Sequence, residues 1–332
     1  MDAASSSGTP PAPGRAKGRM LVVRGGALGD FILTLPVLAA LRRAFPATHL
    51  EVLAYPRPAQ LAVEAGIVDA ARALESRGLA GFFARKGALD PEWSDYFASF
   101  NVVVSYLYDP DRHFQDNVGR VSRAQFLEGP HKPEEPSERH AAQQLLRPLE
   151  RLAIFDADPL PRLTALGAGG VAPGPGRRRL VAHPGSGGAR KNWPEARWRE
   201  LLERLDARGD LDVDLVGGEA EAARLPGLAR GLETVRCVVS EPLPLLARRM
   251  AGASLFVGHD SGVTHLAAAM GVRGLVLWGP TCEAVWRPRS ERFMCLRHAQ
   301  GLEGLPVDVV ESCLLDLLER PASPGNDAVP GP

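Results

Sequence analysis

Short apolar runs alternate with longer amphipathic stretches along most of this chain. In the first half, this pattern predicts strands at 20–24, 49–55 and 101–107 and helices at 29–44 and 137–153. Ser137 would be the N-cap of the second of these helices, since its hydroxyl can accept a hydrogen bond from a first-turn amide. Continuous apolar runs of this length are typical of strands buried on both faces of a parallel sheet.

The same alternation resumes in the second half, after a segment at 166–179 that has no periodicity. The predicted strands of this half are 180–183, 212–218, 234–240, 254–258 and 274–279, and the predicted helices begin near Pro194, pass through Glu221, span 243–251 and begin at Ser261. The segment between the halves holds five glycines and two prolines, which predicts a linker. The chain is therefore expected to form an α/β protein with two parallel-sheet domains, 19–165 and 180–320, and ligands should bind in the loops that follow strands.

Composition and charge narrow the class of protein. Hydrophobic residues make up 45% of the 332 residues and charged residues 23%, as in a globular chain, while 1–18 and 321–332 have the composition of disordered tails. The 39 basic and 39 acidic residues cancel, so the overall charge does not favour nucleic acid as a partner. The four cysteines match no zinc spacing, and no apolar run reaches the roughly 18 residues of a membrane span. We therefore expect a cytoplasmic protein.

The loop after the first predicted strand, from Gly25 to Asp30, does not fit a dinucleotide site. The glycine spacing G-x-G-x-x-G fails in either register, and Ala27 and Asp30 stand where two of the glycines are required. The loop offers instead a carboxylate, Asp30, at the opening turn of a helix that faces the predicted cleft. Asp30 is either a functional acid or only an acid that stabilises the helix N-terminus, and the pattern leaves both open.

The loop at 183–195 is rich in glycine and has the composition of an anion site. Its glycines and Ser186 can direct backbone N–H groups at an anion, and Lys191 adds a mobile positive charge. It is not a Walker motif, because no Gly-Lys-Ser/Thr occurs. An ordinary strand–helix loop, capped by Asn192 with Pro194 at the helix start, is the alternative.

The loop after the predicted strand at 254–258 carries the strongest signal. Asp260, Ser261 and Gly262 open an Ala-rich helix, and the amides at a helix N-terminus form a ready anion site. His265 lies on the first turn and can donate to the same anion. A lone histidine would be interpreted as part of the core, but a helix start, a glycine and a hydroxyl within one short span favour an anion site.

Three motifs in these loops resemble glycosyltransferase family 9, the bacterial ADP-heptose:lipopolysaccharide heptosyltransferases. They are VVRGGALGDFILTLPVLAALR, HPGSGGARKNWPEARWRELLERL and GHDSGVTHLAAAMGVRGLVLWGPT, in the family's order over about residues 20–300. The resemblance implies the GT-B fold, in which two Rossmann-like domains with parallel sheets face a cleft. It also implies an inverting, metal-independent transfer of heptose, or a related sugar, from an ADP-sugar held by the C-terminal domain, with no cofactor.

The same resemblance implies roles for residues of this chain. Asp30 matches the family's catalytic carboxylate and would act as general base on the acceptor hydroxyl. The positions that match nucleotide-sugar-binding residues are Ser186, Gly187 and Lys191 in the phosphate loop, Glu221 near the nucleoside, and Asp260, Ser261, Gly262, Val263 and His265 around the diphosphate and donor sugar. Negative charge on the leaving ADP would be neutralised without a metal by the helix dipole, backbone amides, Lys191 and His265.

Some positions depart from the family pattern. His259 stands where the family often has Asn, and Cys282 where it often has an acid. Both flank the donor pocket, so the identity of the sugar stays open. The D-x-D strings at 109–111, 156–158 and 212–214, which hold a metal in other glycosyltransferases, match no family site and are interpreted as surface acids.

The implied partners are ADP-heptose and a lipid-linked, lipopolysaccharide-core-like acceptor at the cytosolic face of the inner membrane. The basic residues that could contact an anionic acceptor, or form only an exposed basic loop, are Arg112, His113, Arg120 and Arg123. One alternative is a transferase of the same family that uses another sugar and another glycan acceptor. Another is a catalytically silent nucleotide-sugar-binding protein, which the retention of Asp30 disfavours, and a sugar-nucleotide epimerase is disfavoured because the motifs match the transferases.

Overall fold

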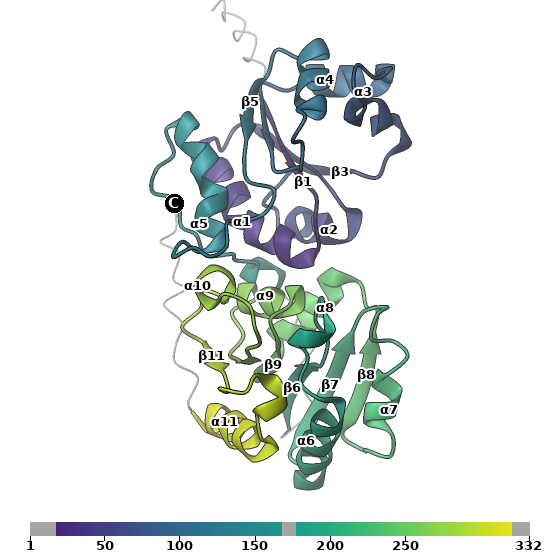
Figure 1. Cartoon of the computed structure of the whole chain (residues 1–332), viewed down its shortest axis with the longest axis vertical. Coiled ribbons are helices and arrows are strands. Elements are labelled where there is room, and N and C mark those ends of the chain that lie inside the picture. The colour runs from purple at the N-terminus through teal and green to yellow at the C-terminus, as the bar shows by residue number, and fades with distance from the viewer. Residues whose placement is uncertain (1–17, 168–176, 321–332) are drawn as a thin grey trace, which may run out of the picture.

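The computed structural model describes residues 18–167 and 177–320, which form two α/β units stacked along the long axis of the molecule (Figure 1). The predicted tails 1–18 and 321–332 lie outside the described residues, apart from Gly18. Most of the predicted linker 166–179 lies outside them too. Its two ends are described, and they belong to a 3-10 turn at 164–167 and to a strand that starts at residue 178.

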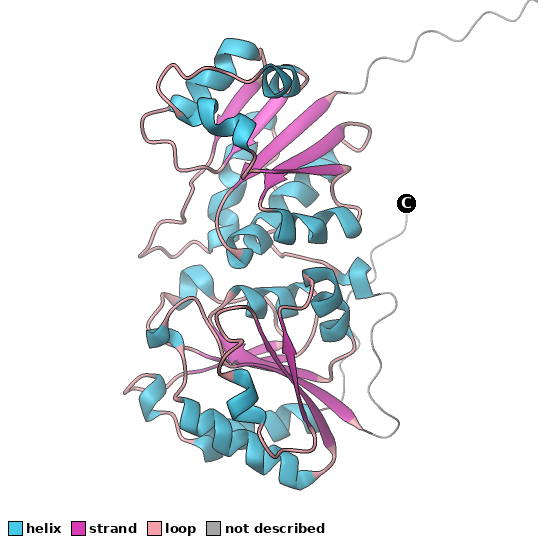
Figure 2. Ribbon diagram, turned by 90° about the vertical axis from the view of Figure 1, so that its right-hand side faces the viewer, coloured by secondary structure: helices cyan, strands magenta, loops and turns pink. Residues whose placement is uncertain are grey.

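The first unit is a five-stranded parallel sheet between two layers of helices (Figure 2). Its strands are β1 (Arg19–Arg24), β2 (His49–Ala54), β3 (Ala70–Ala73), β4 (Val102–Ser105) and β5 (Gln125–Glu128), in the spatial order β3-β2-β1-β4-β5. Its helices are α1 (Leu28–Ala44), α2 (Pro56–Glu64), α3 (Pro91–Ala98), α4 (His113–Val121) and α5 (Ala141–Leu146), with 3-10 turns η1 (Arg77–Phe83) and η2 (Arg147–Leu152).

The second unit is a six-stranded parallel sheet, also covered by helices. Its strands are β6 (Arg178–His183), β7 (Leu211–Gly217), β8 (Val235–Val239), β9 (Leu255–His259), β10 (Gly274–Leu277) and β11 (Phe293–Leu296), in the spatial order β11-β10-β9-β6-β7-β8. Its helices are α6 (Glu195–Arg208), α7 (Leu225–Ala229), α8 (Leu243–Ala251), α9 (Gly262–Ala269), α10 (Glu283–Trp286) and α11 (Val307–Glu319), with 3-10 turns η3 (Thr164–Gly167), η4 (Ala189–Lys191) and η5 (Leu302–Gly304).

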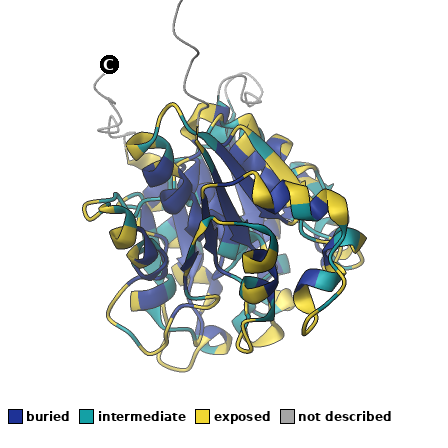
Figure 3. Cartoon of the chain, turned by 90° about the horizontal axis from the view of Figure 1, so that it is seen from above, coloured by how far each residue is buried: buried dark blue, intermediate teal, exposed yellow. Residues whose placement is uncertain are grey.

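Burial on both sheet faces explains the continuous apolar runs of the sequence. In β1, Met20 and Val22 belong to one core cluster, and Leu21 and Val23 belong to the cluster on the opposite face. The central strands of both sheets accordingly lie in the buried interior, and exposed residues gather on the surrounding helices and loops (Figure 3). The edge strands β3, β5 and β8 are largely exposed or half-buried. The predicted α/β class with two parallel sheets is confirmed.

The two units pack directly against each other through helices. Helix α1 contacts α9 and α2 contacts α8, and η3 also packs on α8. The amide of Leu163 donates to the carbonyl of Ala269 at 2.8 Å. The chain therefore already lies against the second unit before it reaches the predicted linker.

Two predicted helix positions are wrong. The helix expected from Ser137 begins at Ala141 with His140 as its N-cap, because the Ser137 side chain closes a local turn in place of a helix cap. The Ser137 hydroxyl instead accepts the Arg139 N–H at 3.1 Å. Glu221 lies in a turn, and α7 begins four residues later.

Several elements form where none is predicted, among them β3, β5, β11 and helices α2 to α4, α10 and α11. Most of these elements are short, so that tertiary packing decides them. Helix α11 is the exception, because its 13 residues carry apolar positions at helical spacing that the sequence analysis does not use. Within residues 18–167 and 177–320, no helix combines the length and apolar character that crossing a bilayer requires.

Candidate active site

The predicted loops lie where the strand order of each sheet reverses. In the first sheet β1 and β4 flank the reversal, and in the second sheet β6 and β9 flank it. Such a reversal opens a crevice at the carboxyl ends of the strands, where α/β proteins bind ligands. The loops after β1, β6 and β9 carry Asp30, Lys191 and Asp260, so all three motifs lie at these two crevices.

The N-terminus of α1 meets the N-terminus of α9 across the two units. A Cβ atom on Gly262 would lie 2.6 Å from the Gly29 nitrogen, and one on Gly29 would lie 3.4 Å from the Gly262 Cα. The Cδ2 atom of His265 lies 3.7 Å from that same Cβ position on Gly29. Glycine at both positions allows this close approach. The contact brings Asp30, on the first turn of α1, beside the first turn of α9.

Both carboxylate oxygens of Asp30 are held. Oδ1 accepts a hydrogen bond from Arg24 Nη2 at 3.1 Å, and Oδ2 accepts one from the Ala27 N–H at 2.9 Å. The second bond satisfies an amide at the start of α1, so Asp30 does act as a helix-start acid. The side chain is 32% exposed, and each oxygen keeps a lone pair for a further partner. The helix-stabilising role and a role as proton acceptor are therefore compatible.

A buried arginine that the sequence analysis does not assign stands behind Asp30. Arg24 is 2% exposed, although it ends an otherwise apolar strand. Besides Asp30, its guanidinium donates to the carbonyls of His131 at 2.9 Å and Tyr106 at 3.4 Å. Burial lowers the pKa of Arg24, and the Asp30 carboxylate opposes this shift. The charged end of the run MLVVR was the available signal.

The glycine-rich loop after β6 is closed on itself by Ser186. The Ser186 hydroxyl donates to the carbonyl of Gly188 at 2.9 Å and accepts the Gly188 N–H at 3.3 Å. Nothing lies within 4 Å of a Cβ built on Gly187, so the loop offers its backbone to open space. The Asn192 side chain does not cap α6, since its Oδ1 is buried with no hydrogen-bond partner in the described chain. The loop therefore differs from the capped alternative.

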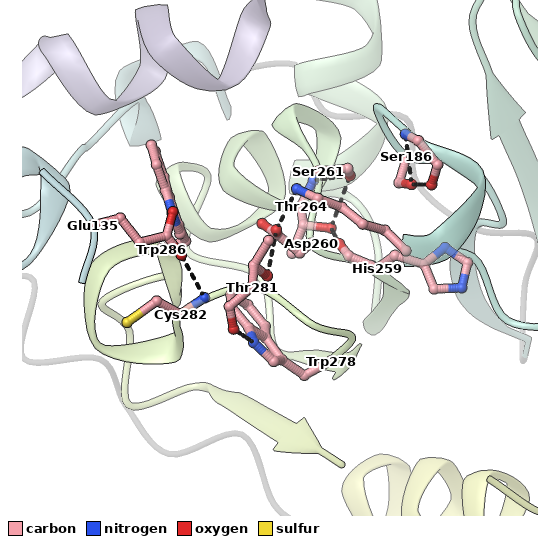
Figure 4. A network of polar contacts seen from close by, with 12 residues as sticks. Glu135, Ser186, His259, Asp260, Ser261, Thr264, Trp278, Thr281, Cys282 and Trp286 are labelled. Carbon is pink, nitrogen blue, oxygen red and sulfur yellow. Dashed lines mark hydrogen bonds and ion pairs between the residues drawn. The ribbon is translucent and has the colours of Figure 1, made fainter. Parts of the chain in front are cut away.

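Lys191, at the end of this loop, reaches the loop after β9. Its ammonium lies 2.7 Å from Asp260 Oδ2, and the same oxygen accepts the Thr281 hydroxyl at 2.8 Å (Figure 4). Asp260 is only 7% exposed, whereas the Lys191 side chain is 31% exposed. This ion pair joins two motifs that are 69 residues apart in the chain into one site.

The N-terminus of α9 is capped but keeps free amides. The Ser261 hydroxyl accepts the Thr264 N–H at 3.3 Å and lies 3.3 Å from His183 Nδ1. The N–H groups of Gly262 and Val263 belong to the first turn, where the helix offers them no carbonyl. Together with the positive end of the helix dipole, they make this corner of the crevice suitable for an anion.

His265 lies among charged groups of both units. Its side chain is almost fully buried, at 6% exposure. Burial lowers the pKa of His265, the Asp260 and Asp30 carboxylates oppose this shift, and Lys191 adds to it. The ring is therefore neutral at neutral pH and has one N–H to donate.

His259 holds the glycine-rich loop through hydrogen bonds from both of its ring nitrogens. Its Nε2 accepts the Trp193 N–H at 2.9 Å, and its Nδ1–H donates to the Gly185 carbonyl at 3.3 Å, so the two ends of the loop are bound to one ring. Burial lowers the pKa of His259 to about 4, which keeps the ring neutral. His259 is 0% exposed, so its side chain acts on the site through the loop that it holds.

Glu221 lies behind the same loop. Its Oε2 accepts the Gly218 N–H at 2.9 Å, and a Cβ on Gly185 would lie 2.4 Å from its Oε1. Arg224 lies 3.8 Å from Oε1. Glu221 thus packs against the start of the glycine-rich loop.

Glu135 connects the loop after β5 to the second unit, and the sequence analysis assigns it no role. One carboxylate oxygen accepts the Cys282 N–H at 2.9 Å, and the other accepts the Trp286 Nε1–H at 3.0 Å (Figure 4). These two bonds lower the pKa of the Glu135 carboxyl. Cys282 takes part through its backbone, so its place in the site does not depend on the thiol.

A cavity of about 1080 Å³ lies toward the other end of α9. It is lined by the crossing segment at 160–164, by the end of α9 and by residues 283–292. None of the predicted site residues lines it, although a much smaller neighbouring cavity reaches His265. The predicted site is therefore defined by converging polar groups and not by this cavity.

One D-x-D string is not a surface feature. Asp214 is 0% exposed, and Arg179, Arg236 and Arg249 surround its carboxylate at 3.4, 3.2 and 3.0 Å. The interpretation of this residue as a surface acid is wrong, because β7 turns it toward the arginines of its neighbours. Among the residues that the structure describes, no group of three or more His, Cys, Asp or Glu side chains has an arrangement suited to a metal ion.

Comparison with known proteins agrees with this arrangement. The model of glycosyltransferase family 9 (heptosyltransferase) matches residues 138–305. Lipopolysaccharide heptosyltransferase 1 of Pseudomonas aeruginosa is 44% identical over 108 residues, which cover 32% of this chain and 30% of that protein. Lipopolysaccharide heptosyltransferase 3 of Escherichia coli is 24% identical over 80% of this chain and 85% of its own length. The match thus spans less than a third of the first relative.

Solved structures share the fold over nearly the whole chain. The E. coli heptosyltransferase WaaC with ADP has a TM-score of 0.72 at 20% identity, covering 90% of this chain and 99% of that one. The same protein with ADP-2-deoxy-2-fluoro heptose has a TM-score of 0.69, with the same identity and coverage. The predicted GT-B fold is confirmed.

Proposed function

This chain belongs to glycosyltransferase family 9, and we propose that it transfers heptose from ADP-heptose to a lipopolysaccharide-core-like acceptor. As a family member it is a glycosyltransferase. One observation carries the proposal: the α1–α9 contact places Asp30, on the first turn of α1, beside the first turn of α9. His265 on that turn feels the charges of Asp30, Asp260 and Lys191 together. The names of the relatives, and the nucleotides bound to the solved neighbour, support heptose and ADP as the donor's two parts.

The proposed reaction is a single displacement at the anomeric carbon of the heptose. The acceptor oxygen forms a bond to that carbon while the bond from carbon to the ADP oxygen breaks, and ADP leaves with the electron pair. Asp30 takes the hydroxyl proton on a carboxylate oxygen that retains a lone pair. Attack from the first unit, opposite to departure on the second, inverts the anomeric configuration.

Negative charge on the departing diphosphate is neutralised by groups of the second unit. Lys191 supplies a full positive charge, and neutral His265 supplies one N–H. The amides of Gly262 and Val263 supply N–H groups at the positive end of the α9 dipole. The amides and His265 are in place before the donor binds, and Lys191 is within the same loop cluster, so these groups support a mechanism in which the chain itself takes the place of a metal ion.

Asp260 has two roles in this proposal. Before the donor binds it holds Lys191, and a diphosphate then competes for the ammonium. Once Lys191 turns to the diphosphate, Asp260 keeps its bond to Thr281 and can accept a hydroxyl of the sugar. Glu221, which packs against Gly185 at the start of the glycine-rich loop, is assigned to the nucleoside.

The acceptor in this proposal is a lipid-linked oligosaccharide presented at the cytosolic face of the inner membrane. The protein would act in the cytoplasm with peripheral membrane contact. The first unit would receive the acceptor, since Asp30 stands at its crevice.

The test is transfer from ADP-heptose to heptose-deficient lipopolysaccharide, followed by mass spectrometry. We expect a gain of one heptose, an inverted anomeric centre by NMR, and unchanged turnover in excess EDTA. A thermal-shift series with ADP-, UDP- and GDP-sugars should show stabilisation by the ADP-sugar alone, since ligands of the native state raise the melting temperature. Tight binding of ADP-heptose without transfer to any acceptor would indicate a silent binding protein, and loss of turnover in EDTA would contradict the metal-free mechanism.

A further inference from the structure

An exposed aromatic pair lies at the crevice of the first unit. Tyr108 follows β4, one of the two strands that flank the reversal of strand order, and it is 71% exposed. Its ring contacts the imidazole of His131, on the loop after β5, with centroids 4.6 Å apart and planes inclined by 58°. Two neighbouring loops thus present one continuous aromatic surface at the end of the sheet that carries Asp30.

Arg24 ties this aromatic surface to Asp30. The same guanidinium donates to Asp30 Oδ1 and to the backbone carbonyl of His131. It also donates to the carbonyl of Tyr106, two residues before Tyr108. The distance between the aromatic pair and the carboxylate is therefore set by one buried side chain.

Exposure alone would not distinguish Tyr108, because single exposed aromatics are common on protein surfaces. Phe155 is also 71% exposed, but it lies elsewhere. Asp158, three residues after Phe155, lies near enough to Arg43 for that charge to lower its pKa, and Arg43 is in the last turn of α1. The thirteen residues from Asp30 to Arg43 span about 20 Å of helix. Phe155 therefore belongs to the opposite end of the sheet and serves as a matched control.

We propose that Tyr108 and His131 form a platform on which a pyranose ring of the acceptor stacks, beside Asp30; this inference rests on the function proposed above. One face of a pyranose ring carries C–H groups of slight positive charge, which suit the negative face of an aromatic ring. Aromatic side chains offer such area at little cost in conformational entropy. The exposed Arg112 and Lys132 follow the two aromatic residues closely in the chain, and their charges suit an acceptor sugar that carries a negative charge.

The platform binds a part of the acceptor that does not react. Removal of such an interaction weakens the binding of the acceptor equally in the ground state and in the transition state. It therefore raises KM for the acceptor and leaves kcat unchanged. Tyr108→Ala should raise this KM about fivefold, the equivalent of about 1 kcal/mol. Tyr108→Phe keeps the ring and should behave as the wild type. His131→Ala should raise KM less, and it leaves intact the backbone carbonyl that binds Arg24.

Binding without turnover provides the second measurement. The probe is the oligosaccharide obtained by removing lipid from heptose-deficient lipopolysaccharide, observed by saturation-transfer difference NMR. We expect transfer to the C–H protons of one sugar face in the wild type, in Tyr108→Phe and in the control Phe155→Ala, and loss of this signal in Tyr108→Ala. ADP affinity should be equal in all four proteins, since the nucleotide belongs to the other unit.

The outcomes separate this inference from the proposed function. If the wild type transfers no heptose but binds the oligosaccharide in a Tyr108-dependent way, the proposed function fails and the platform stands. If Tyr108→Ala binds the oligosaccharide as the wild type does, or if the wild type does not bind it, the platform is overturned whatever the transfer assay shows. Equal effects of Tyr108→Ala and Phe155→Ala would also overturn it.

Discussion

The crevices of the two units occupy equivalent places in their sheets but are built differently. At the β6/β9 crevice most of the polar groups are buried: His259 is 0% exposed, His265 6% and Asp260 7%. Lys191, which reaches Asp260 from the glycine-rich loop, is 31% exposed. At the β1/β4 crevice, Asp30 is a third exposed, and Tyr108 stands 71% in solvent. One crevice is a closed polar network, and the other is an open surface supported by a single buried arginine.

The difference has a physical consequence for binding. Buried dipoles and charges with fixed partners are already oriented when a ligand arrives, and they act in a medium of low dielectric constant. This suits a diphosphate, whose charge must be neutralised at defined points. An open edge with aromatic area and mobile cations suits a larger, partly apolar glycan, for which contact area matters more than fixed charges. Four predictions test whether the two crevices divide the work in this way.

The largest expected effect is on the chemical step at the open crevice. Asp30→Asn keeps the size of the side chain but cannot take a proton, so kcat should fall by about 10²–10⁴. Donor affinity, measured by calorimetry on the same preparation, should stay within twofold of the wild type. The control Asp111→Asn changes an exposed acid of the same unit and should have no effect on either quantity. Near-normal turnover in Asp30→Asn would reduce Asp30 to a helix-start acid.

The second effect should appear only at the closed crevice. Lys191→Ala and His265→Ala each remove a donor to the diphosphate, and a bond to a charged group is worth about 1.5–3 kcal/mol, so ADP-heptose should bind about 10–100-fold more weakly. Lys86→Ala, which alters an exposed lysine of the first unit, should bind the donor normally. Calorimetry that found wild-type affinity in both site variants would remove the proposed anion site.

The third effect concerns stability at acid pH. Burial lowers the pKa values of His140 and His259 to about 4 and that of His183 to about 3. Below pH 6.5 the unfolded chain therefore binds protons that the folded protein does not, so the free energy of unfolding should fall as the pH drops from 7 to 4. In His259→Asn the side-chain amide still offers a donor for the Gly185 carbonyl and an acceptor for the Trp193 N–H, but it cannot titrate. Its loss of stability between pH 7 and pH 5 should be smaller than that of the wild type by on the order of 1–2 kcal/mol.

Urea unfolding at pH 5, 6 and 7 measures this effect. The exposed His298 provides a control, and His298→Asn should keep the pH dependence of the wild type. A parallel loss of stability in His259→Asn and the wild type would mean that His259 is protonated in the folded state.

The smallest effect should come from the bond that links the crevices. Glu135→Gln replaces a carboxylate that accepts two N–H bonds from the second unit with an amide that can accept only on its oxygen. Because the contact is exposed, kcat/KM should fall by at most about fivefold. Glu138→Gln, an exposed change in the same loop, is the control. A larger loss in Glu135→Gln than in Lys191→Ala would show that alignment of the units, and not donor binding, limits the reaction.

Much of the fold could be predicted from local pattern. The apolar runs at β1, β6 and β9 predict strands because each is buried on both faces, and the helices after them begin within about two residues of their predicted positions. The helix expected at Ser137 failed because the Ser137 hydroxyl bonds the amide two residues on, in a turn that competes with a helix cap. Asp214 was misplaced because alternation within a strand cannot show that its polar face meets three arginines.

The sequence by itself determined the three motifs and hence the residues that gather at the crevices. Spacing within a loop is local, so a glycine run, a helix start and its acid are readable without the fold. Only the tertiary structure decided that Lys191 meets Asp260, that His259 binds the glycine-rich loop, and that Arg24 stands between Asp30 and the aromatic pair. Each of these contacts joins segments brought together by strand order or by the packing of buried surface. A side chain's role there depends on neighbours that are far away in the chain, and no local pattern records them.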